Sequence, residues 1–338
     1  MKFVKNKLLI LSLVFFVLGL GIGLWAENKI TPTQNANPAA NLAPTNSSEE
    51  FHSGGFQFIN PLYECNTGEN YGYKQLSSLQ SNINTYINQV TSNNTVTSVS
   101  VYFRDLNNGP WFGINEHNDF APSSLLKVPV MMAYFKAAES DPTVLSKQIA
   151  YNQDPVGVIP ENFPPKHPLV KGKTYTVEQL IEQMIIASDN VALRLLEDNI
   201  DNSKIDQVTL DLGITTATDT TPENFMDVSE YSTLFRVLYY STYLDRDYSE
   251  KALEILSKVE FTQGLVQYLP RDMAVAHKFG ERDLPDGTHQ LHDCGIVYYP
   301  KRPYLVCIMT KGPDFNDLSA SIEQISGKIY SLYSQKYH

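Results

Sequence analysis

The chain has 338 residues, of which 42% are hydrophobic and 11% aromatic. This length and composition allow one large domain, or two small ones, with a substantial core, and they exclude a chain that is disordered throughout. The net charge of -11 comes from 37 acidic and 26 basic residues, and it argues against a nucleic-acid partner, because such a partner selects a basic face.

The first 26 residues have the pattern of a membrane anchor or a signal segment. Three lysines precede an uncharged run from Leu8 to Trp25, whose length approaches the ~20 residues that cross a bilayer as a helix. The sequence after the run is a poor cleavage site, because Trp25 interrupts the small residues that such a site requires. We therefore expect residues 1–26 to be an uncleaved anchor, with the rest of the chain outside the cytoplasm. The alternative is a cleaved signal and a secreted protein.

Residues 27–55 are rich in Asn, Pro, Ala, Thr and Ser, a composition typical of a flexible spacer. Regular hydrophobic periodicity begins near residue 70. We therefore predict a flexible extracytoplasmic linker over residues 27–69 and one folded domain over residues 70–338.

Within this domain, hydrophobic spacing predicts the secondary structure in chain order. Apolar residues at helical spacing predict a helix over residues 76–90. β-Branched and aromatic residues on both sides of an Asn-Gly turn predict two strands within residues 95–116. A further helix is expected from Ser123. Five prolines and several glycines predict a loop over residues 151–174.

The second half of the domain begins with a helix start signal. Thr176 and Gln179 form a capping box. The apolar face of the helix that it starts comprises Leu180, Ile181, Met184 and Ile185. The elements expected after it are helices over residues 189–260, a strand over 273–281, two strands joined by a hairpin over 290–312, and an amphipathic helix over 318–332.

Strands at both ends of the domain and helices in its middle predict an α+β fold. We expect one antiparallel five-stranded sheet, completed by chain ends that meet in space and flanked by terminal helices, with an inserted all-helical subdomain. Cys294 and Cys307 fall on the two strands of one predicted hairpin. They either form a disulfide or remain buried thiols.

The stretch "SSLLKVPV" places Ser124 three residues before Lys127 at the head of an apolar helix. Three residues are nearly one helical turn, so the two side chains lie on one face. A lysine that is desolvated there can lose its proton near neutral pH and serve as a base. The alternative interpretation is a helix-capping serine followed by a lysine whose head reaches water.

Two later stretches favour the catalytic interpretation. A polar triplet, Ser188 to Asn190, lies between two apolar helical segments, and a predicted strand ends in "HKFGE", with Lys278 before Phe279. The order and separation of these elements match the signatures S-x-x-K, S-D-N and K-T-G of the penicillin-recognising serine enzymes. The chain resembles the class A beta-lactamase family over nearly everything after residue 70. The resemblance implies the beta-lactamase/transpeptidase-like fold.

This resemblance implies four catalytic residues. Ser124 would attack a carbonyl carbon and become acylated, and Lys127 would take its proton, directly or through water. Ser188 would pass a proton to the leaving nitrogen, helped by Lys278. The family requires no cofactor, and no cluster in the sequence has the spacing of metal ligands.

The resemblance also implies a substrate-binding set. Asn190 would donate a hydrogen bond to an amide of the substrate and orient Lys127. Phe279, Gly280 and Glu281 would line the other wall. The backbone N–H groups of Ser124 and Glu281 would form the oxyanion hole.

The chain departs from the family pattern in two places. An E-x-x-L-N loop, whose glutamate activates the deacylating water in the family, has no counterpart before "DTTPENFM". Glu223 is the nearest carboxylate, and we interpret it as a first-turn helix residue. Phe279 replaces the threonine or serine whose hydroxyl helps to bind the substrate carboxylate. His277 and His292 flank this region and could donate there, although surface or interface positions are the commoner role for such histidines.

These features leave three functional hypotheses open. The first is a serine hydrolase that acts on beta-lactams, with slow deacylation because the loop is missing. The second is a peptidase or acyl transferase that acts on cell-wall peptides and is trapped by beta-lactams. The third is a non-catalytic wall-binding domain with a relic site. We expect a monomer whose partner is a small beta-lactam or a cell-wall peptide.

Overall fold

The computed structural model describes residues 56–61, 72–107, 109–217 and 223–337. The predicted anchor, and the predicted linker apart from residues 56–61, lie outside these ranges. In the described part of the chain, no helix combines the length and the apolar character that a membrane crossing needs.

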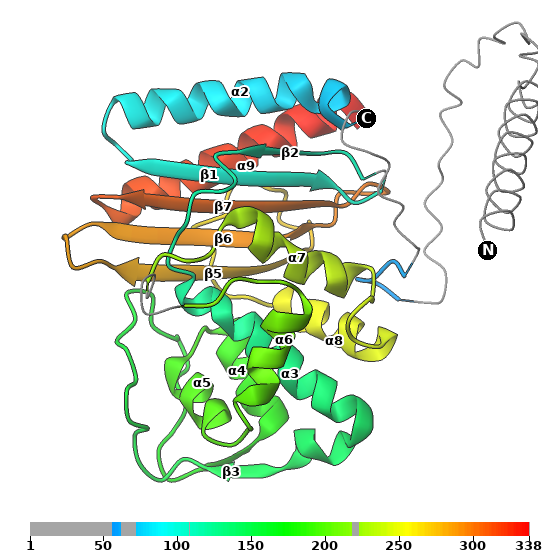
Figure 1. Cartoon of the computed structure of the whole chain (residues 1–338), viewed down its shortest axis with the longest axis vertical. Helices are drawn as coiled ribbons and strands as arrows, with labels where there is room; N and C mark the ends of the chain where they lie inside the picture. Colours follow the sequence, from blue (N-terminus) through cyan, green and yellow to red (C-terminus); the bar gives the residue numbers. More distant parts are fainter. Residues whose placement is uncertain (1–55, 62–71, 108, 218–222, 338) are drawn as a thin grey trace, which may run out of the picture. The chain divides into compact units, whose positions relative to one another are not determined.

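A five-stranded antiparallel sheet forms one layer of the domain, as predicted (Figure 1). Its strands, in spatial order, are β2 (Trp111–Ile114), β1 (Ser98–Asp105), β7 (Tyr304–Gly312), β6 (His289–Val297) and β5 (Val275–Asp283). The first strand therefore pairs with the last one along its whole length, from Ser98 opposite Lys311 to Asp105 opposite Tyr304. This pairing closes the sheet from chain ends, and it leaves β5 at one edge.

The two terminal helices pack on one face of the sheet. Helix α2 (Gly72–Ser92) and helix α9 (Phe315–Tyr337) contact each other and the sheet. One hydrophobic core, which includes Ile83, Phe103 and Ile322, fills the space between these helices and the strands. The predicted helices over residues 76–90 and 318–332 are thus confirmed.

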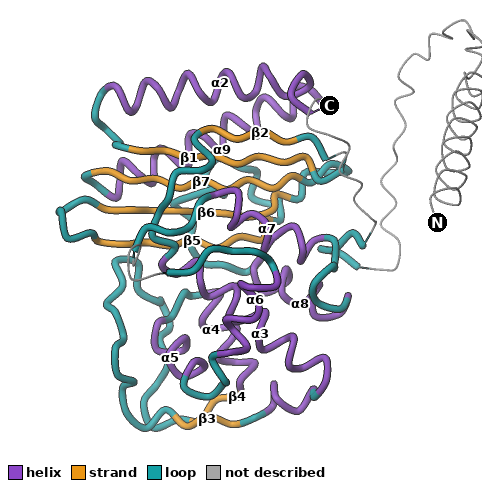
Figure 2. The backbone as a smooth tube through the Cα atoms, viewed as in Figure 1, coloured by secondary structure: helices purple, strands orange, loops and turns teal. Residues whose placement is uncertain are grey.

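The other face of the sheet is covered by the helical region (Figure 2). Its helices are α3 (Lys127–Ser140), α4 (Val177–Ile186), α5 (Asn190–Glu197), α6 (Ser203–Asp211), α7 (Val228–Tyr239) and α8 (Arg246–Leu256). Helix α3 is buried on most of its surface, which explains its nearly charge-free sequence. The predicted capping box at the start of α4 is present, with both of its reciprocal hydrogen bonds.

Three local features differ from the sequence predictions. Residues Ser123–Leu126 form a separate 3-10 helix, η1, ahead of α3. Two three-residue strands, β3 (Gln148–Ala150) and β4 (Thr174–Thr176), pair at the ends of the predicted loop. Part of the predicted linker packs on the domain, because the Glu250 carboxylate accepts hydrogen bonds from the amides of residues 57–59.

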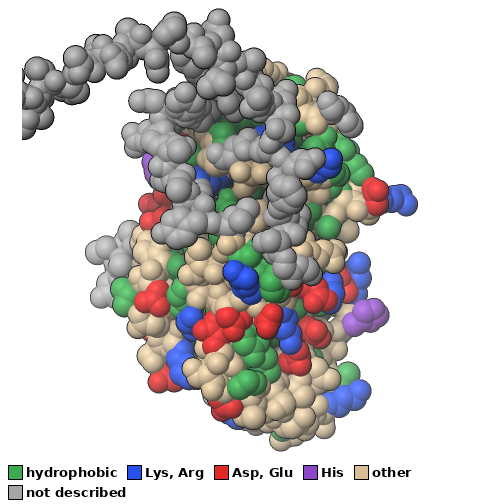
Figure 3. Space-filling model, turned by 90° about the vertical axis from the view of Figure 1, so that its right-hand side faces the viewer, with side chains coloured by type: hydrophobic (Ala, Val, Ile, Leu, Met, Phe, Trp, Pro, Cys, Tyr) green, Lys and Arg blue, Asp and Glu red, His purple; other side chains and the backbone are tan. Residues whose placement is uncertain are grey.

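Acidic and basic side chains lie side by side on the face of the domain shown in Figure 3. Within the helical region, Lys136 pairs with Glu139 at 2.8 Å and Lys258 pairs with Glu254 at 2.7 Å. Partly exposed pairs of this kind stabilise a protein by at most ~1 kcal/mol each. The stability of the domain therefore rests on the two hydrophobic cores.

Cys294 and Cys307 form a disulfide between directly opposed residues of β6 and β7, which resolves the alternative left open by the sequence. A bond across 13 residues of sequence restricts the unfolded chain, and such a restriction stabilises by about 2–4 kcal/mol. We expect the double variant Cys294→Ala/Cys307→Ala to lose about this much unfolding free energy in a denaturant titration.

Two controls accompany this measurement. The reduced wild-type protein should unfold close to the double variant, and Cys65→Ala should unfold like the oxidised wild type. Three free thiols in the untreated, denatured protein would contradict the assignment.

Candidate active site

The 3-10 helix η1 carries the predicted nucleophile, Ser124, at the edge strand β5. Ser123, directly before it, has a φ of +50°, a left-handed conformation that costs free energy for a residue with a side chain. The segment before and around Ser124 is tied down from three sides. Gln290 accepts from the Ala121 amide, His292 contacts the Ala121 carbonyl, and Tyr231 donates to the Leu125 carbonyl.

Lys127 begins helix α3, and its side chain is fully buried. Its ammonium nitrogen lies 3.0 Å from Ser124 Oγ and 3.0 Å from Ser188 Oγ, and it also donates to the Ser188 carbonyl. Burial lowers the pKa of Lys127 to about 8, although the negative charge of Glu161 acts to raise it. A lysine with this pKa is partly neutral near pH 7, so it can accept the proton of Ser124.

Ser188 lies in the turn between α4 and α5, with a φ of +57°. Asp189 caps helix α5 by accepting from the amides of Val191 and Ala192, so its role is structural. The cap turns Ser188 toward the two lysines. Its hydroxyl lies 3.0 Å from Lys127 Nζ and 2.8 Å from Lys278 Nζ. The four residues predicted to be catalytic thus form one continuous chain of hydrogen bonds.

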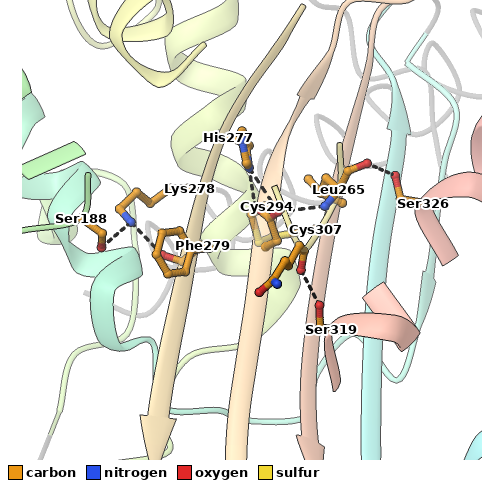
Figure 4. Close-up of polar contacts among 11 residues, drawn as sticks. Ser188, Leu265, His277, Lys278, Phe279, Cys294, Cys307, Ser319 and Ser326 are labelled. Atoms are coloured by element: carbon orange, nitrogen blue, oxygen red, sulfur yellow. Dashed lines mark hydrogen bonds and ion pairs between the residues drawn. A yellow bond between two sulfur atoms is a disulfide. The ribbon is translucent and has the colours of Figure 1, made fainter. Parts of the chain in front are cut away.

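Lys278, on β5, donates to Ser188 Oγ and, at 2.9 Å, to the carbonyl of Phe279 (Figure 4). Burial, and next the positive charge of Lys127, hold its pKa well below the usual range. The Phe279 ring lies 4.2 Å from the Lys278 ammonium and stacks on Phe261 at 4.1 Å. Phe279 is 3% exposed, so its ring is buried beside the Lys278 ammonium.

Gly280 lies where β5 passes close to η1. A Cβ atom there would meet the Pro122 carbonyl oxygen at 2.8 Å and the Leu125 side chain at 3.0 Å. This close approach gives the glycine a packing role, in addition to its predicted place in the substrate-binding wall. It also brings β5 against the segment that carries Ser124.

A segment of the predicted loop enters the site, which the sequence did not indicate. We call residues 159–163 the strap. Asn190 Nδ2 donates to the Ile159 carbonyl at 2.8 Å, and the Asn190 amide donates to Glu161 at 2.6 Å. Asn190 was predicted to orient Lys127, but the hydrogen-bond partners of Lys127 among the described residues are Ser124 and Ser188. Asn190 instead holds the strap.

Glu281, the predicted oxyanion-hole residue, holds the other side of the strap. Its carboxylate accepts from the amides of Asn162 at 2.9 Å and Phe163 at 3.1 Å. Burial raises the pKa of Glu281 and also that of Glu161. A sequence signal for Glu161 was absent, since a single acidic residue in a proline-rich loop is usually solvated.

Three flanking residues differ from their predicted roles. Glu223 lies before α7, which begins at Val228, and it pairs with Arg282 at 3.3 Å, so it is not a first-turn residue. His277 is buried against Asp293 at 2.9 Å. His292 is also buried, and burial lowers its pKa to about 4. Neither histidine is a surface residue, because both side chains are buried.

Two hollows border the strap. A pocket of about 360 Å³ lies beside Ser124 and is lined by Asn190, Arg194, Glu281 and the strap residues Ile159 and Pro160. A second pocket of about 320 Å³ lies on the Phe279 side of the strap. Within the described residues, no group of three His, Cys, Asp or Glu side chains could hold a metal ion.

The comparisons with known proteins agree with this fold. The model of the beta-lactamase enzyme family matches residues 79–333. No curated protein sequence matches the chain. Among solved structures, PBP-A is 22% identical with a TM-score of 0.63, covering 75% of this chain and 97% of PBP-A.

Two further solved structures each have a TM-score of 0.65 and 20% identity. The match to a beta-lactamase from Sphaerobacter thermophilus covers 75% of this chain and 97% of that protein. The match to a class A beta-lactamase from Bacteroides cellulosilyticus covers 76% of this chain and 99% of that protein. Identities at this level establish the shared fold, and the family match extends over most of the chain. The chain therefore belongs to the beta-lactamase enzyme family.

Proposed function

We propose that this protein is an active-site-serine enzyme that forms an acyl-enzyme with beta-lactams or related amides. Ser124 Oγ attacks the carbonyl carbon while Lys127 takes the hydroxyl proton. The C–N bond then breaks, and the nitrogen receives a proton from Ser188, which Lys278 helps to supply. The continuous hydrogen-bond chain from Ser124 to Lys278 is the observation that carries this proposal.

Release of the acyl group is proposed to be slow. Hydrolysis of the ester needs a base that activates water near Ser124. Two carboxylates are candidates for this base, and each has another partner. Glu161 accepts from the Asn190 amide, and Glu223 pairs with Arg282. The sequence also lacks the E-x-x-L-N motif. We therefore expect an acyl-enzyme that accumulates.

A peptidase or acyl transferase acting on cell-wall peptides is the second candidate. The slow hydrolysis proposed above would suit it, because such an enzyme passes its acyl group to an amine and is trapped by beta-lactams. A mutant of PBP-A, a structural neighbour, has been solved as an acyl-enzyme with penicillin G. The third candidate, a relic site, is disfavoured by the intact hydrogen-bond chain.

A location outside the cytoplasm belongs to the same proposal. The basic start of the chain and the uncharged run from Leu8 to Trp25 support a membrane anchor, with secretion as the alternative. Either location would bring the domain close to wall peptides.

Intact-protein mass spectrometry tests the proposed chemistry. We expect the full-length protein, mixed with benzylpenicillin, to gain the mass of the drug and to keep it from seconds to hours. Ser124→Ala is the matched control and should gain nothing. Rapid consumption of the drug without an accumulated adduct would contradict slow deacylation, and absence of both would contradict the acyl-transfer function.

A further inference from the structure

The leaving group of a substrate has a defined side of the site. Ser124, which would keep the acyl group, lines the pocket of about 360 Å³. Ser188, which would protonate the leaving nitrogen, is separated from Ser124 by the Lys127 ammonium. Ala187, directly before Ser188, lines the second pocket, of about 320 Å³. A substituent on the leaving nitrogen is therefore directed toward the second pocket.

The second pocket has an apolar wall next to the catalytic residues. Phe163, Phe261, Phe279 and Ile186 line it. The rings of Phe261 and Phe279 stack with their centroids 4.1 Å apart, and the Phe163 ring meets Phe261 edge-on at 5.2 Å. An apolar cavity of about 150 Å³ is enough to hold benzene. The second pocket therefore has the size and the wall that an apolar substituent needs.

A carboxylate in the second pocket would gain little from the charges around it. Within the described part of the chain, the charged side chains that line this pocket are Lys166 and Glu260, one of each sign. Lys166 is exposed, and an exposed ammonium pairs with a carboxylate only weakly, because water screens both charges. Glu260 would repel the carboxylate.

Lys278 stands directly before Phe279, but it is closed to a carboxylate from the solvent. Its side chain is 0% exposed, and the Phe279 ring lies 4.2 Å from its ammonium (Figure 4). The ammonium already donates to Ser188 Oγ and to the Phe279 carbonyl. Burial, and next the charge of Lys127, lower the pKa of Lys278, so it loses its charge more readily than an exposed lysine. A carboxylate could reach this amine only after the ring had moved.

We propose that the second pocket is a leaving-group subsite that takes an apolar substituent and disfavours a carboxylate. The preferred substrates are then amides or beta-lactams whose leaving nitrogen bears an apolar group, with no free carboxylate on the adjacent carbon. Among peptides, this selects bonds inside a chain over bonds whose leaving residue ends the chain. The inference rests on the proposed function and concerns the same site.

Benzylpenicillin and two of its esters separate the effect of charge from that of an apolar group. The acid has a carboxylate on the carbon next to the lactam nitrogen, the methyl ester lacks the charge, and the benzyl ester adds a ring. We expect the methyl ester to acylate the wild type at least as fast as the acid does. The benzyl ester should react about threefold faster than the methyl ester or more, because its ring enters the second pocket. Quenched mass spectrometry gives the rate constants and shows that the ester is intact in the adduct.

Two variants identify the residues responsible. Phe279→Thr uncovers Lys278 and adds a hydroxyl, so it should shift the ratio of the two rate constants toward the acid, against the methyl ester, by about tenfold. Lys166→Ala removes the exposed cation and should leave this ratio within about twofold of the wild-type value. The intrinsic reactivities of the compounds cancel when a variant is compared with the wild type. Thermal unfolding checks that each variant is folded, and the wild-type comparison does not depend on either variant.

The outcomes distinguish this inference from the function on which it rests. A wild type that the acid acylates faster than the methyl ester would overturn the subsite and leave the acyl-enzyme intact. A benzyl ester no faster than the methyl ester would do the same, as would an unchanged ratio in folded Phe279→Thr. A loss of rate in Lys166→Ala with the acid alone would make Lys166 a carboxylate partner and also overturn it. Absence of a Ser124 adduct with all three compounds in every protein would overturn the proposed function, and the subsite with it.

Discussion

Replacing Lys127 with methionine is expected to slow acylation of Ser124 by benzylpenicillin by about 10²–10⁴-fold, the usual contribution of a positioned general base. The Lys127 amine lies 3.0 Å from Ser124 Oγ and has no neighbouring base to replace it among the contacts of that hydroxyl in the described residues. Stopped-flow or quenched mass spectrometry gives the rate constant. Methionine keeps the length of the side chain, so the fold should persist.

The pH profile of the wild type tests the same assignment. The pKa of Lys127 is lowered to about 8, and only the neutral amine can accept a proton. The acylation rate constant should therefore rise about tenfold per pH unit well below 8 and level off above it. In Lys127→Met this dependence should vanish. A flat wild-type profile between pH 6 and 8 would contradict the role of Lys127.

Hydrophobic periodicity, together with turn and capping signals, predicted most elements of the fold. The helices at both ends of the domain, and the long strands β1, β5, β6 and β7, each carry enough residues for their period to be recognised. The pairing of β1 with β7 followed from the need to complete one sheet from chain ends. Strands β3 and β4 were missed because three residues are too few to show a period.

The candidate site could be predicted only where a motif encodes it. Ser124, Lys127, Ser188 and Lys278 meet as expected, because helix and strand geometry projects them from fixed positions. The strap could not be predicted. The prolines around Glu161 indicate a loop, but the path of a loop depends on distant partners such as Asn190 and Glu281, which local sequence does not encode.

The position of the Phe279 ring could not be predicted from the sequence either. The sequence indicates that a hydroxyl is missing from the wall of the site, but it does not indicate where the ring goes. The structure stacks the ring on Phe261 and places it over Lys278. The Phe279 ring thus packs on Phe261, covers the Lys278 ammonium and contacts Phe163 of the strap.

Phe279→Thr is expected to lower the stability of the protein and to raise its acylation rate constant. Loss of a buried aromatic ring should lower the unfolding free energy by about 3–5 kcal/mol. The new hydroxyl, and the uncovered Lys278 ammonium, should bind the carboxylate of a penicillin. A hydrogen bond to a charged group is worth about 1.5–3 kcal/mol, so the acylation rate constant should rise by roughly 10- to 100-fold.

Phe279→Val is the matched control, because valine has the shape of threonine without the hydroxyl. Both variants should lose similar stability in a denaturant titration, and both should loosen the aromatic anchor of Phe163. Acylation by 6-aminopenicillanic acid, which has the carboxylate but no acyl side chain, isolates the effect of the hydroxyl. Equal rate constants in the two variants would show that Phe279 acts by covering Lys278, and not by the hydroxyl it displaces.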